Sequence, residues 1–159
     1  MSIEIEVQYA VDDTEVDGAT LPDESDFTLW INTALAGRCT AAQLTVRIVG
    51  AAESANLNET YRQKLGPTNV LSFDYDCPED LGLPLMGDLV VCAPVVFREA
   101  KEQHKTDSAH WAHMVVHGSL HLLGFDHIDD NEASEMEALE TDLLTRLGCP
   151  DPFAIEKVA

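Results

Sequence analysis

Positive charge is the scarcest property of this sequence. Its 159 residues include nine Lys and Arg against 29 Asp and Glu, a formal net charge of −20 with histidine neutral. Such a charge opposes non-specific, charge-driven binding to nucleic acid or to anionic membranes, because both carry the same sign. Any anion that this protein handles must therefore be bound at a small local site, against the overall field.

Three other features are missing. No apolar run approaches the roughly 20 residues that cross a bilayer, so no membrane association is expected. The first residues, Met1 to Glu6, have neither the basic region nor the apolar core of a signal peptide. The four cysteines are widely spaced, without a Cys-x-x-Cys pair, which favours free thiols in a reducing compartment. Together these absences predict a cytoplasmic protein.

The length and composition indicate one domain over residues 1–159. Apolar residues make up 45% and charged residues 24%, the ordinary balance of a globular protein. The acidic excess is concentrated at the two ends of the sequence. Residues 1–37 and 126–142 hold nine and eight acids with no Lys or Arg, whereas residues 38–105 hold nine acids and seven bases.

The pattern of apolar residues and turn signals predicts the order of secondary structure. Alternating or continuous apolar residues predict strands near 3–7, 44–49, 70–73 and 89–92. Helical spacing and stop signals predict helices near 27–35, 57–65, 94–104, 108–123 and 131–147. Asp107 or Ser108 is expected to cap the fourth helix, and the acidic, Pro- and Gly-rich residues 74–87 are expected to form an exposed loop. The order predicts an α+β domain.

Four of the six histidines lie within the segment 113–127. His117 and His121 are four residues apart, so a helix places both imidazoles on one face, where they can hold one ion. Gly124 can end that helix in a left-handed conformation and let the chain return with His127 as a third ligand. Three neutral imidazoles leave a tetrahedral ion one open position for water, the arrangement of catalytic zinc. The alternative, histidines that bind no metal, is disfavoured by this combination.

The same spacing occurs in metzincin proteases as H-E-x-x-H-x-x-G-x-x-H. In this chain Gly118 stands where those enzymes carry their general-base Glu. Peptide hydrolysis needs that base to activate water and then to protonate the leaving amine. The metal-binding pattern is therefore retained while the protease interpretation loses its central residue, and a phosphodiester substrate becomes more plausible.

Three further residues are candidates for the site. His113 lies one turn before His117, and a core role or a role in supporting a ligand from behind is favoured over a fourth ligand position. Asp126 is equally compatible with orienting a ligating imidazole and with a solvated turn. Arg62 has a guanidinium that can hold two phosphate oxygens, although the residues alone favour a helix-surface position.

The segments 57–62, 68–73, 86–89 and 117–127 together resemble the bacterial YbeY family, in the same order and within residues 40–150. Members of that family are single-domain, metal-dependent endoribonucleases that mature ribosomal RNA and act in ribosome quality control. The resemblance implies a small mixed β-sheet packed by about five helices, similar to that of zinc metalloproteases.

By the same resemblance, His117, His121 and His127 bind one Zn²⁺ per chain, or another divalent transition metal. Arg62 is similar to a catalytically important arginine, and His117 is expected to be catalytic as well. The implied function is a single-strand-specific endoribonuclease that matures the 3′ end of 16S ribosomal RNA, with the ribosome or ribosomal proteins as partners and the oligomeric state left open. Asn69 departs from the Asp that many members carry, and an Asn cannot act as a general base.

Two other functions stay open at this stage. A zincin-like metalloprotease would need a replacement acid, such as Glu59 or Asp88. A non-enzymatic, ribosome-associated module would have a structural metal in a closed four-ligand site, for example with His113. Because residues 38–105 are nearly neutral, we also expect a basic or neutral patch near the metal, drawn from Arg47, Arg62, Lys64, Arg98, Lys101 and Lys105.

Overall fold

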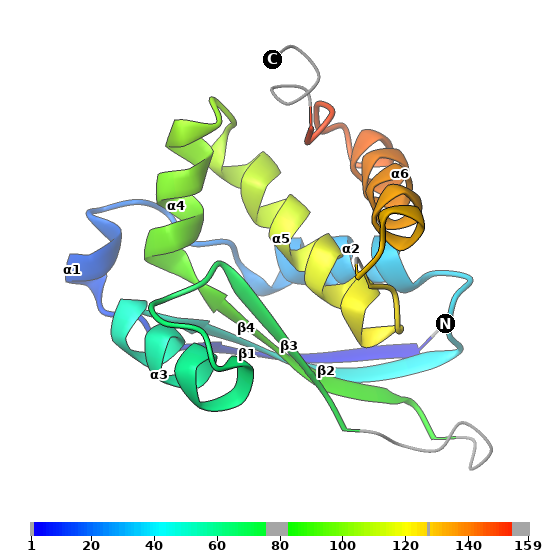
Figure 1. Ribbon diagram of the computed structural model, residues 1–159, viewed down its shortest axis with the longest axis horizontal. Coiled ribbons are helices and arrows are strands. Elements are labelled where there is room, and N and C mark those ends of the chain that lie inside the picture. Colours follow the sequence, from blue (N-terminus) through cyan, green and yellow to red (C-terminus); the bar gives the residue numbers. More distant parts are fainter. Residues whose placement is uncertain (1, 76–82, 127, 154–159) are drawn as a thin grey trace.

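A four-stranded mixed sheet forms the centre of the protein (Figure 1). The computed structural model describes residues 2–75, 83–126 and 128–153. The strand order is β1-β2-β4-β3, with β1 parallel to β2, β2 parallel to β4, and β3 antiparallel to β4. The strands are β1 (Ser2–Tyr9), β2 (Ala41–Val49), β3 (Val70–Asp74) and β4 (Leu85–Cys92). The fold class and the mixed sheet implied by the resemblance are confirmed.

Helices cover the two faces of the sheet unequally (Figure 1). One face carries the main core, to which α2, α4 and α5 contribute buried residues, and α6 packs on α5. The opposite face carries a smaller cluster beneath α3. The helices are α1 (Asp13–Val16), α2 (Glu24–Leu35), α3 (Ala51–Arg62), α4 (Ala93–Glu102), α5 (Asp107–Leu122) and α6 (Asp130–Arg146). Among the described residues, no helix is both long and apolar enough to cross a membrane.

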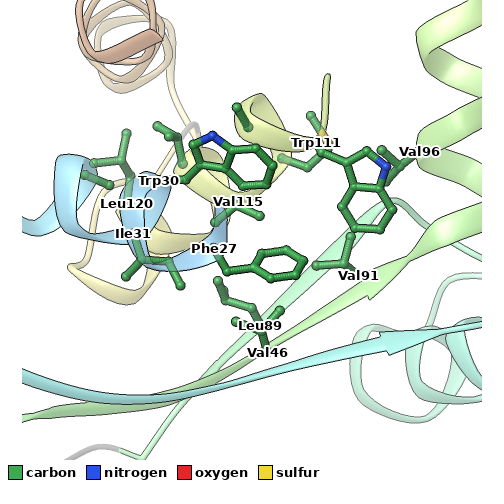
Figure 2. Packing of buried hydrophobic residues seen from close by; sticks show 14 of the residues in the cluster. Phe27, Trp30, Ile31, Val46, Leu89, Val91, Val96, Trp111, Val115 and Leu120 are labelled. Atoms are coloured by element: carbon green, nitrogen blue, oxygen red, sulfur yellow. The ribbon is translucent and has the colours of Figure 1, made fainter. Parts of the chain in front are cut away.

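Aromatic packing fixes α5 over the sheet (Figure 2). The ring of Trp111 on α5 lies edge-on to Phe27 of α2 and to Phe97 of α4, with ring centroids 6.2 and 5.5 Å apart. Val46 and Leu89 from the central strands lie beneath Phe27, fully buried. Such edge-to-face contacts add to the burial of apolar area. The helix that carries the histidine motif is thereby held on a rigid base.

Local signals predicted most of these elements, and three expectations were wrong. The loop expected at 74–87 is shorter, because Asp74 pairs with Gly87 across the ladder and β4 begins at Leu85; residues 76–82 lie outside the described part of the chain. Helix α5 is capped by Thr106, whose Oγ1 accepts from the Ala109 N–H, rather than by Asp107 or Ser108. Helix α3 ends at Arg62 instead of continuing to Leu65, and the short α1 was not predicted.

Helix α5 approaches the sheet most closely at Gly118. A Cβ atom there would lie 2.9 Å from Leu89 Cδ2, 3.1 Å from Val70 Cγ2 and 3.1 Å from Ser72 Oγ. The Ser72 hydroxyl donates a 2.9 Å hydrogen bond to the Gly118 carbonyl. A side chain at position 118 would therefore push against Leu89, Val70 and Ser72, and glycine lets α5 lie against β3 and β4 without displacing them.

This close approach predicts that Gly118→Ala destabilises the protein. In an exposed helix the change would stabilise by about 1 kcal/mol. Here we expect a loss of about 1–3 kcal/mol in the free energy of unfolding, because the methyl group overpacks the contact with the sheet. Urea denaturation, monitored by circular dichroism, measures this change in the free energy of unfolding. Ser108→Ala, in the exposed first turn of α5, is the control and should change stability by less than about 0.5 kcal/mol. A Gly118→Ala variant as stable as the parent would contradict the packing argument.

Candidate metal centre

His117 and His121 bring their ring nitrogens together on one face of α5. Their Nε2 atoms are 3.1 Å apart, and the ring centroids are 4.6 Å apart. The helix ends at Leu122, and Gly124, the glycine predicted to stop it, follows with a φ of +101°. The Gly124 N–H then donates to the His121 carbonyl at 3.0 Å, so the chain reverses directly after the second histidine.

The reversed chain fixes the ring of His121. Its Nδ1 lies 2.9 Å from the carbonyl oxygen of Phe125. A carbonyl oxygen only accepts hydrogen bonds, so the Nδ1 atom carries the proton and donates it. In the neutral ring the lone pair is then on Nε2, the atom that faces His117.

A buried carboxylate fixes the orientation of the His117 ring. Its Nδ1 is hydrogen-bonded to Glu140 Oε1 of α6, and Glu140 is only 2% exposed. Burial raises the pKa of Glu140, but the neighbouring His113 and His117 rings outweigh that effect and lower the pKa to about 2. The carboxylate is therefore ionised at neutral pH and accepts the Nδ1 proton of His117. The lone pair of the neutral His117 ring is left on Nε2.

The two Nε2 lone pairs thus face each other, which suits a shared cation. A tetrahedral zinc ion bound at about 2.0–2.1 Å from each nitrogen holds two imidazole nitrogens about 3.3 Å apart, close to the spacing of His117 and His121. The third predicted ligand, His127, lies outside the described residues. Within 2–75, 83–126 and 128–153 there is no cluster of three metal-ligating side chains.

His113 faces away from this pair of nitrogens. Its Nδ1 lies 3.4 Å from the Lys105 ammonium, and its Nε2 lies 3.7 Å from Glu140 Oε2. The side chain is buried, and this burial lowers the pKa of His113 despite the nearby carboxylate. These contacts favour a buried position beside Glu140, the carboxylate that holds His117, over a fourth ligand position.

A polar cleft of about 500 Å³ joins the histidine pair to Arg62. The Arg62 guanidinium donates to the Ser72 carbonyl at 2.7 Å and lies over the Phe73 ring, 5.1 Å from its centroid. Lys64 also lines the cleft, as do the carboxylates Asp74 and Asp126. The charged side chains of the lining therefore balance, consistent with a neutral patch. Arg47 is instead paired with Glu53 at 2.6 Å.

Glu140 was missed in the sequence, although a signal for it exists. Met136 and Leu143 lie on the buried side of α6, and Glu140 falls between them on the same side. A carboxylate on the apolar side of an amphipathic helix must have a partner, because an unpaired buried charge is too costly. The partner, His117, lies 23 positions earlier in the sequence. The burial of Glu140 therefore indicates that a partner exists but does not identify it.

Glu99 is the second carboxylate that sequence reasoning missed. It accepts from the Asn69 side-chain amide at 3.1 Å and lies 2.9 Å from His110 Nε2. Asn69 Oδ1 accepts in turn from the Val70 N–H at 2.7 Å. An Asp at position 69 would bring a second carboxylate against Glu99, whereas the Asn donates to it. Asn69 therefore ties the start of β3 to α4.

Comparison with known proteins gives two findings. The family model described as endoribonuclease YbeY matches residues 11–148. The solution structure of TM1509 from Thermotoga maritima is similar, with a TM-score of 0.58 and 22% sequence identity over 90% of this chain and 88% of that chain. At that identity the structural likeness supports the fold alone.

The Glu99 contacts predict a specific pH dependence of stability. Burial raises the pKa of Glu99, but hydrogen bonds from His110 and Asn69 outweigh it, so the net pKa is lowered. A carboxyl with a lowered folded-state pKa contributes stability above its unfolded value, about 4.3, and loses it as pH falls through the folded value. Glu99→Gln should be less stable than the parent at pH 7, and the difference should shrink below about pH 4.

Urea denaturation between pH 7 and pH 3 measures this effect. Glu102→Gln is the matched control, because Glu102 lies on the same helix with 64% of its side chain exposed. It should retain the parent's pH profile. A Glu99→Gln variant that loses stability with acid as steeply as the parent would contradict the assignment.

Proposed function

The chain belongs to the YbeY family of endoribonucleases, and on that basis we propose that it is a metal-dependent, single-strand-specific endoribonuclease. Its proposed substrate is ribosomal RNA, which it would cut at the 3′ end of the 16S molecule. Its proposed partners are the ribosome or ribosomal proteins. A role in ribosome quality control is part of the same proposal. The observation that carries the proposal is the convergence of His117 and His121 Nε2 in the cleft that also holds Arg62.

The proposed ligands are His117, His121 and His127, with one Zn²⁺ or another divalent transition metal per chain. The fit rests on the first two, whose Nδ1 atoms are both engaged and whose Nε2 atoms face each other. When bound, the ion supplies a Lewis acid that polarises a phosphate oxygen or lowers the pKa of a water. The Glu140 carboxylate and the Phe125 carbonyl hold the two rings in the tautomer that binding requires.

Arg62 is the proposed group for the phosphate. A guanidinium has five N–H donors, and only some are used by the Ser72 carbonyl, so others can bind the phosphate oxygens as negative charge grows on them. The contact with Ser72 and the Phe73 ring holds the side chain at the cleft before substrate arrives. These interactions apply equally whether water or the 2′-hydroxyl of the RNA attacks the phosphorus.

The protease alternative is less well supported by the geometry. Gly118 occupies the position of the metzincin general base, and even a Cβ there would press against the side chains of Leu89, Val70 and Ser72. Neither of the replacement acids, Glu59 and Asp88, lines the cleft. The Asp88 carboxylate instead accepts from the Tyr75 hydroxyl at 2.8 Å.

Replacing Arg62 tests the phosphate role. Arg62→Ala should reduce cleavage of a single-stranded RNA by about 100-fold or more, because one donor to a developing charge is worth about that much. Bound metal and unfolding midpoint should be unchanged, since Arg62 is exposed. Arg146→Ala is the control: its side chain is 67% exposed and is paired with Asp142, so cleavage should stay at the parental rate. Parental cleavage by Arg62→Ala would refute the role.

Metal content tests the ligand set independently. The purified parent should hold about one zinc per chain by elemental analysis, since three imidazoles bind it, and His121→Ala should lose most of it. Chelation should stop RNA cleavage, and added zinc should restore it. His104→Asn is the control, because His104 is exposed with a φ of +55°, which Asn tolerates. Full metal in His121→Ala would contradict the assignment, and retained metal with no RNA cleavage under any condition would favour a structural module.

A further inference from the structure

A second cavity, of about 310 Å³, lies beside the cleft between α5 and α6. Asn69 and His117 line both spaces, so the cavity and the cleft share a wall. A ligand bound in the cleft next to His117 could therefore extend an attached group into the cavity. The proposed catalytic reaction does not use this space.

The walls of this cavity suit a flat aromatic group. Met114 and Met136, both at least nine-tenths buried, contribute polarisable thioether side chains. The half-buried Phe153 lies edge-on to His113, with ring centroids 5.4 Å apart. Thioethers and aromatic rings make favourable contacts with the faces and edges of other ring systems.

The two spaces differ in charge: the cleft holds cations and carboxylates in balance, and the cavity holds carboxylates alone. Arg62 and Lys64 line the cleft, whereas Glu137 and Glu140 line the cavity. Among the described residues, no Lys or Arg lines the cavity. A phosphate is repelled from the carboxylates and attracted to the cations, and an uncharged ring system is free to enter the cavity.

We propose that this cavity is a subsite for one unstacked nucleobase, adjacent to the phosphate held in the cleft. The proposal rests on the proposed ribonuclease function and deepens it by naming how the substrate is read. A base must leave its stack and its pair to enter a pocket between two helices, which costs little free energy in a single strand and much more in a duplex. The subsite thus gives a physical reason for single-strand specificity.

Glu137 confers a preference among bases. It is exposed at the edge of the cavity, and its carboxylate oxygens accept hydrogen bonds but cannot donate them. Adenine, cytosine and guanine carry an exocyclic amino group that can donate to it, whereas uracil offers only its ring N3–H, flanked by two carbonyl oxygens that a carboxylate repels. The subsite therefore favours amino-bearing bases over uracil.

The experiment uses the metal-loaded protein and short single-stranded RNA oligonucleotides with one cleavage site. Phe153→Ala should raise KM about tenfold, the effect of losing a stack on one base, and leave kcat nearly unchanged. An abasic nucleotide at the subsite position should raise KM of the parent similarly, and with that substrate the parent and Phe153→Ala should become equal. A Phe153→Ala effect that persists at every abasic position would overturn the proposal.

Glu137→Gln provides a second variant at an exposed position that does not endanger folding. The parent protein should prefer cytosine over uracil at the subsite. Glu137→Gln should lose most of that preference, because the Gln amide can also donate a hydrogen bond to a uracil carbonyl. Glu135→Gln, exposed on the same helix and outside the cavity lining, should keep the parental preference. Equal base preferences in all three proteins would count against the subsite.

Binding separates failure of this proposal from failure of the proposed function. Fluorescence anisotropy of the same oligonucleotides, with and without the abasic nucleotide, measures affinity without cleavage. If the parent cleaves no RNA but Phe153→Ala weakens binding only when the base is present, the base subsite holds and the ribonuclease function fails. If Phe153→Ala binds every oligonucleotide as the parent does, the subsite is refuted whatever the activity.

Discussion

The contact between Glu140 and His117 is the constraint on which the rest of the site depends. An ionised carboxylate that is 2% exposed is stable only when donors surround it, because burial of an unpaired charge costs several kcal/mol. Here His117 supplies a donor, and His113 lies beside the second oxygen. Since Glu140 is on α6 and the histidines are on α5, the same contact joins the two helices and directs the His117 lone pair into the cleft.

Features that depend on neighbours in sequence were predictable. The four-residue spacing of His117 and His121 indicates a shared face, and Gly124 indicates the reversal, because both follow from the geometry of one helix and its end. The partners of those rings were not predictable to the same extent. Glu140 reaches the His117 ring from α6, and Glu99 of α4 likewise contacts His110 and Asn69 from outside their own elements. Sequence periodicity shows that a polar residue is buried without showing what it contacts.

The start of β4 illustrates the same limit in the sheet. Residues 85–87 follow Pro84 and end in Gly87, a composition typical of a loop. Pairing of Gly87 with Asp74 nevertheless makes them part of the strand. Long-range pairing routinely overrides local propensity in strands. The cap of α5 differs for a simpler reason: Thr106, Asp107 and Ser108 are all acceptable caps, and only the position of the helix start distinguishes them.

The few basic residues of this protein are placed unevenly, and their positions explain how so acidic a chain could bind a phosphate. Arg47, Arg98 and Arg146 are each paired with a nearby carboxylate, whereas Arg62 and Lys64 lie at the cleft. The overall charge of −20 repels an RNA backbone at long range, where only net charge matters, and the cleft cations act within a few ångströms. With carboxylates lining the cavity on the other side of His117, the proposed subsite favours a strand with its phosphate toward Arg62 and Lys64 and its base toward α6. An acidic surface of this kind disfavours non-specific RNA binding, because repulsion weakens every mode that does not bring a phosphate close to the cleft cations.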